Sequence, residues 1–128
     1  MRWCFGDGKA SELAYATRVL DELRTVTAVV PAVWTLETAN VLVRAESRGL
    51  IGEDRSTAFI ALLRGMRIEF DQATAGHALT DTLALARRHH LSSYDAAYLE
   101  LAVRRQVPLA TLDVDLRKAV KRAGIRLF

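Results

Sequence analysis

The sequence predicts a single α/β domain in which a parallel sheet lies between helices, and three observations lead to this fold class. Short apolar segments that fit buried strands alternate along the chain with longer segments that fit amphipathic helices. At 128 residues, the chain is long enough to bury one hydrophobic core. Its 26% of charged and 51% of apolar residues are typical of a folded globule, and it has no repeats or low-complexity segments. We therefore expect one domain over residues 1–128.

The expected elements follow from the spacing of apolar residues along the chain. The first segment, residues 3–7, is expected to be a loop or short turn. Strands are expected in four short apolar or alternating segments, at residues 27–31, 67–70, 109–112 and 125–128. Helices are expected at residues 11–24, 35–49, 53–66, 74–90 and 93–105, and in a last segment that ends at Gly124.

Each expected helix has an apolar stripe that predicts its buried face. In the second helix Thr35 is a candidate N-cap, and Glu37, Asn40 and Arg44 form a polar stripe. The residues expected to face inward are Leu13, Ala16, Leu20 and Leu23; Leu36, Ala39 and Val43; Phe59, Leu62, Leu63 and Met66; Leu79, Leu83 and Ala86; and Leu116, Ala119, Val120 and Ala123.

The charge is distributed unevenly, although the net charge is only +3. Residues 1–86 carry 9 Lys and Arg against 11 Asp and Glu, a net charge of −2. Residues 87–128 carry 9 against 4, a net charge of +5. A basic C-terminal third suits RNA, DNA or an acidic protein partner, and a merely solubilising surface explains it equally well.

Several classes of protein are disfavoured by what the sequence lacks. Cys4 is the single cysteine, so no internal disulfide forms and a reducing compartment is expected. No apolar run approaches the roughly 20 residues that span a bilayer. The first residues lack the apolar region of a signal peptide. These observations predict a cytoplasmic protein without a membrane association.

Three acidic residues stand at points where strands end or helices begin, the positions at which open α/β sheets bind ligands. Asp95 lies in the first turn of its helix, Asp113 directly follows an expected strand, and Glu37 lies near the start of the second helix. Taken singly, each is explained as a helix-start residue that interacts with the helix dipole. Asp115 fits the capping role of the last helix at least as well as Asp113, which leaves Asp113 available for function.

Taken together, these acids predict a cluster of carboxylates at one edge of the sheet. Such a cluster repels itself, and a bound divalent cation removes that repulsion. Mg²⁺ and Mn²⁺ fit, because both prefer oxygen ligands. Such an ion assists the hydrolysis of phosphodiesters. Thr111 lies two residues before Asp113, on the same side of an extended strand, and is expected to support the site by hydrogen bonding.

Other chemistries have weaker signals. His77, His89 and His90 have no metal-ligand spacing with a cysteine, and we interpret them as surface or helix-end residues. Cys4 has no evident histidine partner for nucleophilic catalysis. The chain also has no Gly-rich phosphate-binding loop, so hydrolysis of nucleotides of the P-loop kind is not expected.

Three segments of the chain resemble a known family. Residues 93–98 (SYDAAY), 108–116 (PLATLDVDL) and 30–42 (VPAVWTLETANVL) are similar, in this order, to motifs of the PIN-domain ribonucleases. The similarity is strongest to the VapC-type toxins of bacterial toxin–antitoxin pairs and extends over nearly the whole chain. It implies a three-layer α/β/α PIN-like domain with a parallel sheet.

The resemblance also implies a function. The family members are Mg²⁺- or Mn²⁺-dependent endoribonucleases that act on structured RNA, are blocked by a cognate antitoxin and are usually homodimers. Glu37, Asp95 and Asp113 match the second, third and fourth catalytic acids of the family, which hold the metal. Asn40 and Thr111 match its supporting polar positions, and Asp115 is a further supporting candidate.

The chain departs from the family pattern at its start. The family opens with a central strand that ends in an Asp, just before a segment similar to residues 3–7. Neither that strand nor its Asp is present here, and Asp7 aligns with the loop beyond it. We therefore expect an N-terminally incomplete PIN-like domain whose true start lies upstream, with three acids in place of four and weaker metal binding.

Three functions follow from the sequence. The first is a metal-dependent endoribonuclease, the toxin of a type II toxin–antitoxin pair. The second is a weakened or inactive PIN-like module that binds RNA or an antitoxin, since the first Asp is missing. The third is a DNA flap-type nuclease, which the small size of the chain disfavours.

Overall fold

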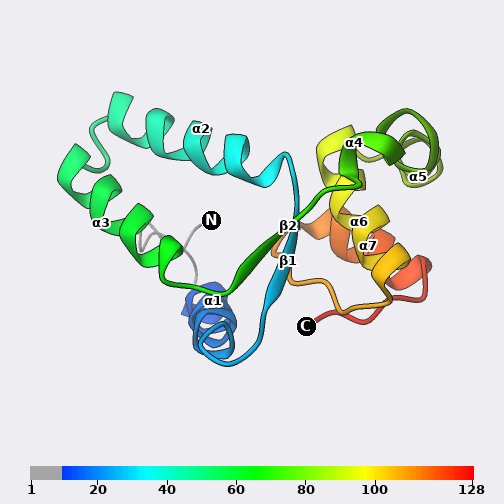
Figure 1. The fold of residues 1–128 in the computed structure, drawn as a ribbon, viewed down its shortest axis with the longest axis horizontal. Coiled ribbons are helices and arrows are strands. Elements are labelled where there is room, and N and C mark those ends of the chain that lie inside the picture. The colour runs from blue at the N-terminus through cyan, green and yellow to red at the C-terminus, as the bar shows by residue number, and fades with distance from the viewer. Residues whose placement is uncertain (1–9) are drawn as a thin grey trace. The chain divides into compact units, whose positions relative to one another are not determined.

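The computed structural model describes residues 10–128, so the expected loop at residues 3–7 and the start of the chain lie outside the described residues. Helices make up most of the described chain, and Figure 1 labels them together with the two short strands. The elements in chain order are α1 (Ala10–Glu22), β1 (Ala28–Pro31), α2 (Trp34–Ser47), α3 (Glu53–Arg64), β2 (Ile68–Asp71), α4 (Thr74–His77), η2 (Ala78–Thr82), α5 (Leu83–His89), α6 (Ser93–Arg105) and α7 (Val114–Arg122).

The chain divides into two compact units. Unit 1 contains the residues up to Val29 together with Val33–Glu69, and unit 2 contains Val30–Ala32 together with Phe70–Phe128. The strands β1 and β2 pair in a two-stranded parallel sheet, and the main chain passes from unit 1 to unit 2 within each of them. The α/β fold class and the parallel pairing are thus confirmed, while the single domain over residues 1–128 stays a prediction.

Unit 1 buries one side of α2 and of α3. Leu42 and Ala45 from α2 pack with Ile51 and Phe59, and Leu63 covers this cluster. The described stripe of α1 is also at least partly buried, as expected, with Ala16 only 4% exposed.

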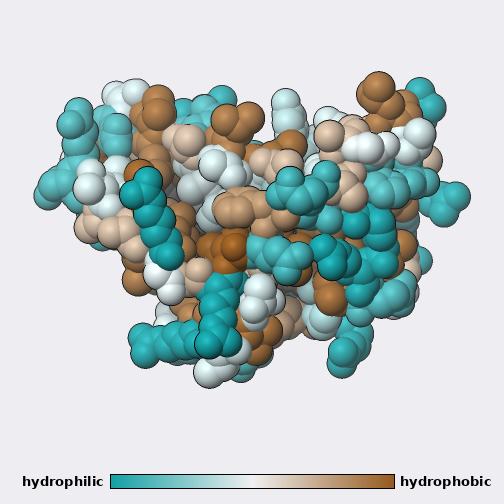
Figure 2. Space-filling model, viewed as in Figure 1, coloured by the Kyte–Doolittle hydropathy of each residue, from teal (hydrophilic) through white to brown (hydrophobic). Residues whose placement is uncertain are grey.

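The predicted inward face of α2 was wrong. Leu36 and Val43 are 75% and 57% exposed, whereas Thr38 and Leu42 are buried. Apolar residues occupy several faces of this helix, so their spacing alone does not select the buried one. For the same reason Leu62 of α3 is 52% exposed, although it was expected inside. Exposed apolar residues of this kind appear among hydrophilic ones on the face shown in Figure 2.

Unit 2 is built around the contact between α6 and α7. Its buried cluster joins Leu99 and Ala102 of α6 with Leu116, Ala119 and Val120 of α7, and Leu109 completes it. The apolar face predicted for the last helix is therefore confirmed. Gly124 follows this helix with a φ of +74°, a left-handed conformation that glycine adopts without strain and that ends the helix as predicted.

The expected helix at residues 74–90 is helical but not α-helical throughout. Residues Ala78–Thr82 form a π-helical turn between α4 and α5. A π-helix closes its hydrogen bonds over five residues, so it rotates the following residues away from the positions of a continuous α-helix. Leu79, within this turn, is 85% exposed, which corrects its predicted inward position, while Ala86 is buried as expected.

The predicted strands at residues 109–112 and 125–128 were wrong, since their described pairing is a single parallel bridge between Leu109 and Leu127. The Leu109 N–H donates to the Arg126 carbonyl at 3.0 Å, and the Phe128 N–H donates to the Leu109 carbonyl at 3.1 Å. Beyond this pair the chain turns toward α7. No helix among residues 10–128 is both long and apolar enough to cross a bilayer.

Candidate functional site

Asp95 is held at the start of α6 by a reciprocal pair of hydrogen bonds. Ser92 is the N-cap, and its Oγ accepts from the Asp95 N–H at 3.0 Å. The Ser92 hydroxyl in turn donates to Asp95 Oδ2 at 2.7 Å. The unpaired N–H groups of the first turn favour a negative charge at this point. The local sequence thus holds a half-buried carboxyl group in one orientation at the beginning of the helix.

Asp113 is the N-cap of α7, whereas the sequence suggested Asp115 for this role at least as strongly. Its backbone is extended, with φ −66° and ψ 126°, and its Oδ1 accepts from the Leu116 N–H at 2.7 Å. Asp115 is instead exposed within the first turn and accepts from Lys118 Nζ at 2.8 Å. The hydrogen bond from Lys118 holds the pKa of the Asp115 carboxyl below its usual value.

Thr111 contacts the main chain of Asp113, and its supporting role in a site stays a prediction. Its Oγ accepts from the Asp113 N–H at 3.1 Å, and this contact turns the chain into α7. Arg117, one turn into the helix, donates from Nη1 to the Thr111 carbonyl at 3.2 Å. The side chain and the carbonyl of Thr111 are therefore both hydrogen-bonded, to Asp113 and to Arg117.

The predicted site residues fall in both units. Thr111, Asp113 and Asp115 lie together at the start of α7, and Asp95 lies at the start of α6 in the same unit. Glu37 is half-buried in the first turn of α2, and Asn40 is exposed one turn later, both in unit 1. A single pocket formed by the acids Glu37, Asp95 and Asp113 stays a prediction.

A buried ionic network runs along α6 and was not predicted. Arg104 donates from Nη1 and Nη2 to Asp71 at 3.1 and 2.8 Å. It also donates from Nε to Glu100 Oε1 at 2.7 Å. The two carboxylate side chains are only 2% and 5% exposed. The hydrogen bond from Arg104 lowers the pKa of Asp71 against the opposing effect of burial, and the two carboxylates raise the pKa of Arg104.

Glu100 also takes part in a second cluster that sequence reasoning missed. His77 Nδ1 lies 2.7 Å from Asp81 Oδ2 and 3.7 Å from Glu100 Oε1. These residues line a pocket of about 440 Å³ in unit 2, together with Ala84, Leu85, Arg88, Val103 and Arg104. The spacing of His77 and Asp81, four residues apart, was a signal available in the sequence, whereas Glu100 on α6 had none.

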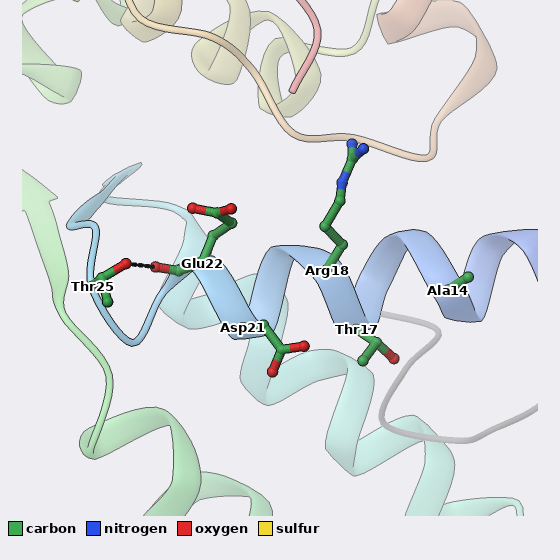
Figure 3. Close-up of a pocket in the computed structure, with 6 residues that line it drawn as sticks. All are labelled: Ala14, Thr17, Arg18, Asp21, Glu22 and Thr25. Carbon is green, nitrogen blue, oxygen red and sulfur yellow. Dashed lines mark hydrogen bonds between the residues drawn. The ribbon is translucent and has the colours of Figure 1, made fainter.

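A second pocket, of about 540 Å³, lies along α1 (Figure 3) and is lined by Ala14, Thr17, Arg18, Asp21, Glu22 and Thr25. Figure 3 shows that Thr17 and Asp21 point to one side of the helix and Arg18 to the other. The hydrogen bond drawn there joins the Thr25 hydroxyl to the Glu22 carbonyl at 3.2 Å and closes the helix end. These side chains do not converge on a common point, so we assign no chemistry to this pocket.

The two roles of Asp113 can be separated by substitution. Asp113→Ala removes the cap and is expected to lower the free energy of unfolding by about 0.5–2 kcal/mol. Asp113→Asn keeps a capping oxygen for the Leu116 N–H and is expected to change the stability much less, because Asn and Asp cap helices about equally well. Urea unfolding of both variants measures the difference, and equal losses would contradict the capping role.

Comparison with known proteins adds two findings. A family model described as the PIN domain matches residues 9–122, a range that includes Glu37, Asp95 and Asp113. Ribonuclease VapC3 of Pyrobaculum aerophilum is 38% identical to this chain over 84 residues. The aligned part covers 62% of this chain and 61% of the relative, so the similarity spans somewhat less than two thirds of that protein.

Proposed function

Since the chain belongs to the PIN-domain family, we propose that it is a divalent-metal-dependent endoribonuclease that cleaves RNA phosphodiester bonds. The family match over residues 9–122 is the observation that carries the proposal. The similarity to ribonuclease VapC3 confirms the resemblance to VapC-type ribonucleases and supports RNA as the substrate. The excess of basic residues after residue 86 fits a polyanionic substrate.

The proposed catalytic acids are Glu37, Asp95 and Asp113, supported by Asn40, Thr111 and Asp115. The donor chemistry of the described aspartates fits Mg²⁺ or Mn²⁺, because both ions prefer carboxylate oxygens. When bound, such an ion supplies Lewis-acid stabilisation of the charge that develops on the phosphodiester. Ser92 holds the Asp95 carboxylate in one orientation, and the cap of α7 does the same for Asp113. Fixed ligands lose little conformational entropy on binding.

Removing divalent cations is expected to abolish RNA cleavage. The chain is incubated with a structured RNA in Mg²⁺ or Mn²⁺, and the products are resolved on a denaturing gel. Cleavage should disappear with EDTA and return on adding Mg²⁺ in excess, because the ion supplies the charge stabilisation that the carboxylates cannot. Cleavage that is insensitive to EDTA would contradict the proposed metal dependence.

A non-cleaving module that binds RNA or an antitoxin is the second candidate. This candidate needs only the family fold and the basic residues after residue 86, and it does not need Glu37, Asp95 and Asp113 to hold an ion together. RNA binding without cleavage in Mg²⁺ and in Mn²⁺ would favour this module over the enzyme.

We further propose that the protein acts in the cytoplasm as the toxin of a type II toxin–antitoxin pair and forms a homodimer. The similarity to ribonuclease VapC3 supports this assignment. A small partner gene beside the coding sequence, whose product co-purifies with this chain and inhibits cleavage, is the expected finding. An isolated gene whose expression leaves growth unchanged would contradict the toxin role.

A further inference from the structure

The cluster of His77, Asp81 and Glu100 brings one nitrogen and two oxygens to the wall of one pocket. One ligand atom from each residue lies within 4.8 Å of the others. Imidazole nitrogen combined with carboxylate oxygen is a donor set that suits Zn²⁺ and its neighbours in the transition series more than Mg²⁺. The cluster therefore differs in chemistry from the all-oxygen site proposed for catalysis.

The spacing of the donor atoms is close to that of a metal site. Two ligands bound to zinc in a tetrahedral arrangement, each at about 2.1 Å, are about 3.4 Å apart. His77 Nδ1 and Glu100 Oε1 are 3.7 Å apart, and His77 Nδ1 and Asp81 Oδ2 are 2.7 Å apart. The His77–Asp81 separation reaches the required value when the exposed Asp81 side chain rotates by less than about 1 Å, and the His77–Glu100 separation does so when the His77 ring moves by about 0.3 Å.

Hydrogen bonds from neighbouring residues hold Glu100 in place, as they do for the ligands of protein metal sites. Glu100 Oε1 accepts a hydrogen bond from Arg104, and Arg104 is held in turn by Asp71. A carboxylate oxygen carries two lone pairs, so Oε1 can accept this bond and still bind a cation. Hydrogen bonds of this kind orient metal-bound carboxylates.

The charges around the cluster and its exposure to solvent both allow a cation to bind. Asp71, Asp81 and Glu100 carry three negative charges, and Arg88, Arg104 and Arg105 carry three positive ones, so the formal charges balance. The Arg104 charge is taken up by its hydrogen bonds to Asp71 and Glu100, and Arg88 is exposed, so its charge is screened by solvent. The Asp81 side chain is 65% exposed and that of His77 32%, which leaves an entry path from solvent.

We propose that His77, Asp81 and Glu100 form a binding site for Zn²⁺ or a similar transition-metal ion, separate from the site proposed for catalysis. Glu100 lies five residues after Asp95 on α6, which places it about 7.5 Å along the helix and about 140° around it. An ion bound at this cluster would link the end of α4, which carries His77, and the π-helical turn, which carries Asp81, to the middle of α6. The inference holds whether or not the chain cleaves RNA.

The test is a titration of the folded chain with Zn²⁺ in the presence of a large excess of Mg²⁺, which occupies oxygen-only sites. Nuclear magnetic resonance of the imidazole nitrogens identifies the histidine that binds, and calorimetry measures the affinity. The variants are His77→Gln and Asp81→Asn, both at partly or fully exposed side chains. His90→Asn is the matched control, because His90 is exposed and its φ of +54° is one that asparagine tolerates.

The first equivalent of Zn²⁺ should shift the ring signals of His77, and each of the two site variants should weaken binding by more than about tenfold. His90→Asn and Asp95→Asn should bind Zn²⁺ as the unaltered chain does, which separates this site from the catalytic one. An unchanged affinity in folded His77→Gln and Asp81→Asn would overturn the proposal. So would shifts confined to His89 and His90, or loss of binding in Asp95→Asn.

Discussion

Replacing Asp95 with asparagine is expected to lower the rate of RNA cleavage by about 100-fold or more. Losing a residue that only hydrogen-bonds a metal ligand already costs about 10–100-fold, and Asp95 is proposed to bind the metal itself. Asparagine keeps the size of the side chain and an oxygen that accepts from the Ser92 hydroxyl. It removes the negative charge that attracts the cation. The initial rate of cleavage at saturating Mg²⁺ measures the effect.

The control is Asp54→Asn, since Asp54 is also an acidic residue in the first turn of a helix, α3, and is exposed. Both substitutions remove a charge that interacts favourably with a helix N-terminus, worth about 0.3–1 kcal/mol. Their effects on unfolding should therefore be similar, whereas only Asp95→Asn should slow cleavage. Equal cleavage by the two variants would remove Asp95 from the proposed catalytic site.

Replacing Arg104 with methionine is expected to destabilise unit 2 by about 3–5 kcal/mol, the range for removing one partner of a buried ion pair. Methionine fills much of the same volume but leaves Asp71 and Glu100 buried without the guanidinium that they share. The free energy of unfolding in urea at neutral pH gives the size of the effect. A loss below about 1 kcal/mol would show that the pair behaves like a surface salt bridge.

Arg105→Met is the matched control for this substitution. Arg105 is the next residue on the same helix, but its side chain is 42% exposed and its nitrogen lies 3.7 Å from Asp71. A longer and more solvated contact of this kind contributes about 0–1 kcal/mol. The difference between the two variants in the free energy of unfolding thus gives the contribution of burial and short hydrogen bonds, because both variants lose one positive charge.

The Asp71–Arg104 pair also predicts a dependence of stability on pH. Arg104 holds the pKa of Asp71 below its ordinary value of 3.8, so the ionised carboxylate is favoured in the folded chain. The stability that this gives is fully present above pH 3.8 and is lost as the pH falls through the lower pKa of the folded state. The Arg104→Met variant should lose stability at a higher pH than the unaltered chain, because its Asp71 is more easily protonated.

The parts of the fold that the sequence predicted are those set by local patterns. The stripe of Leu116, Ala119 and Val120 selects one face of α7, and Gly124 marks its end by a conformation that other residues avoid. Asp95 was recognisable in the first turn of α6, because a helix N-terminus favours an acidic side chain there. In each case the structure depends only on residues that are close together in the sequence.

The parts that failed depend on residues distant in sequence or on the backbone path. Which of Asp113 and Asp115 caps α7 is decided by where the chain turns after Thr111, and not by residue type. The exposure of Leu36 depends on what packs against α2. The partners Asp71 and Arg104 are 33 residues apart, so no local pattern joins them.

The π-helical turn Ala78–Thr82 has a consequence for how relatives of this chain are aligned. Such a turn holds one residue more than an α-helical turn, so a homologue with a single-residue gap there would be α-helical throughout. The gap would rotate the counterpart of His77 by about 100° with respect to α5 and turn it away from the counterpart of Glu100. The proposed site therefore depends on the length of this turn as well as on the identity of its three donor residues.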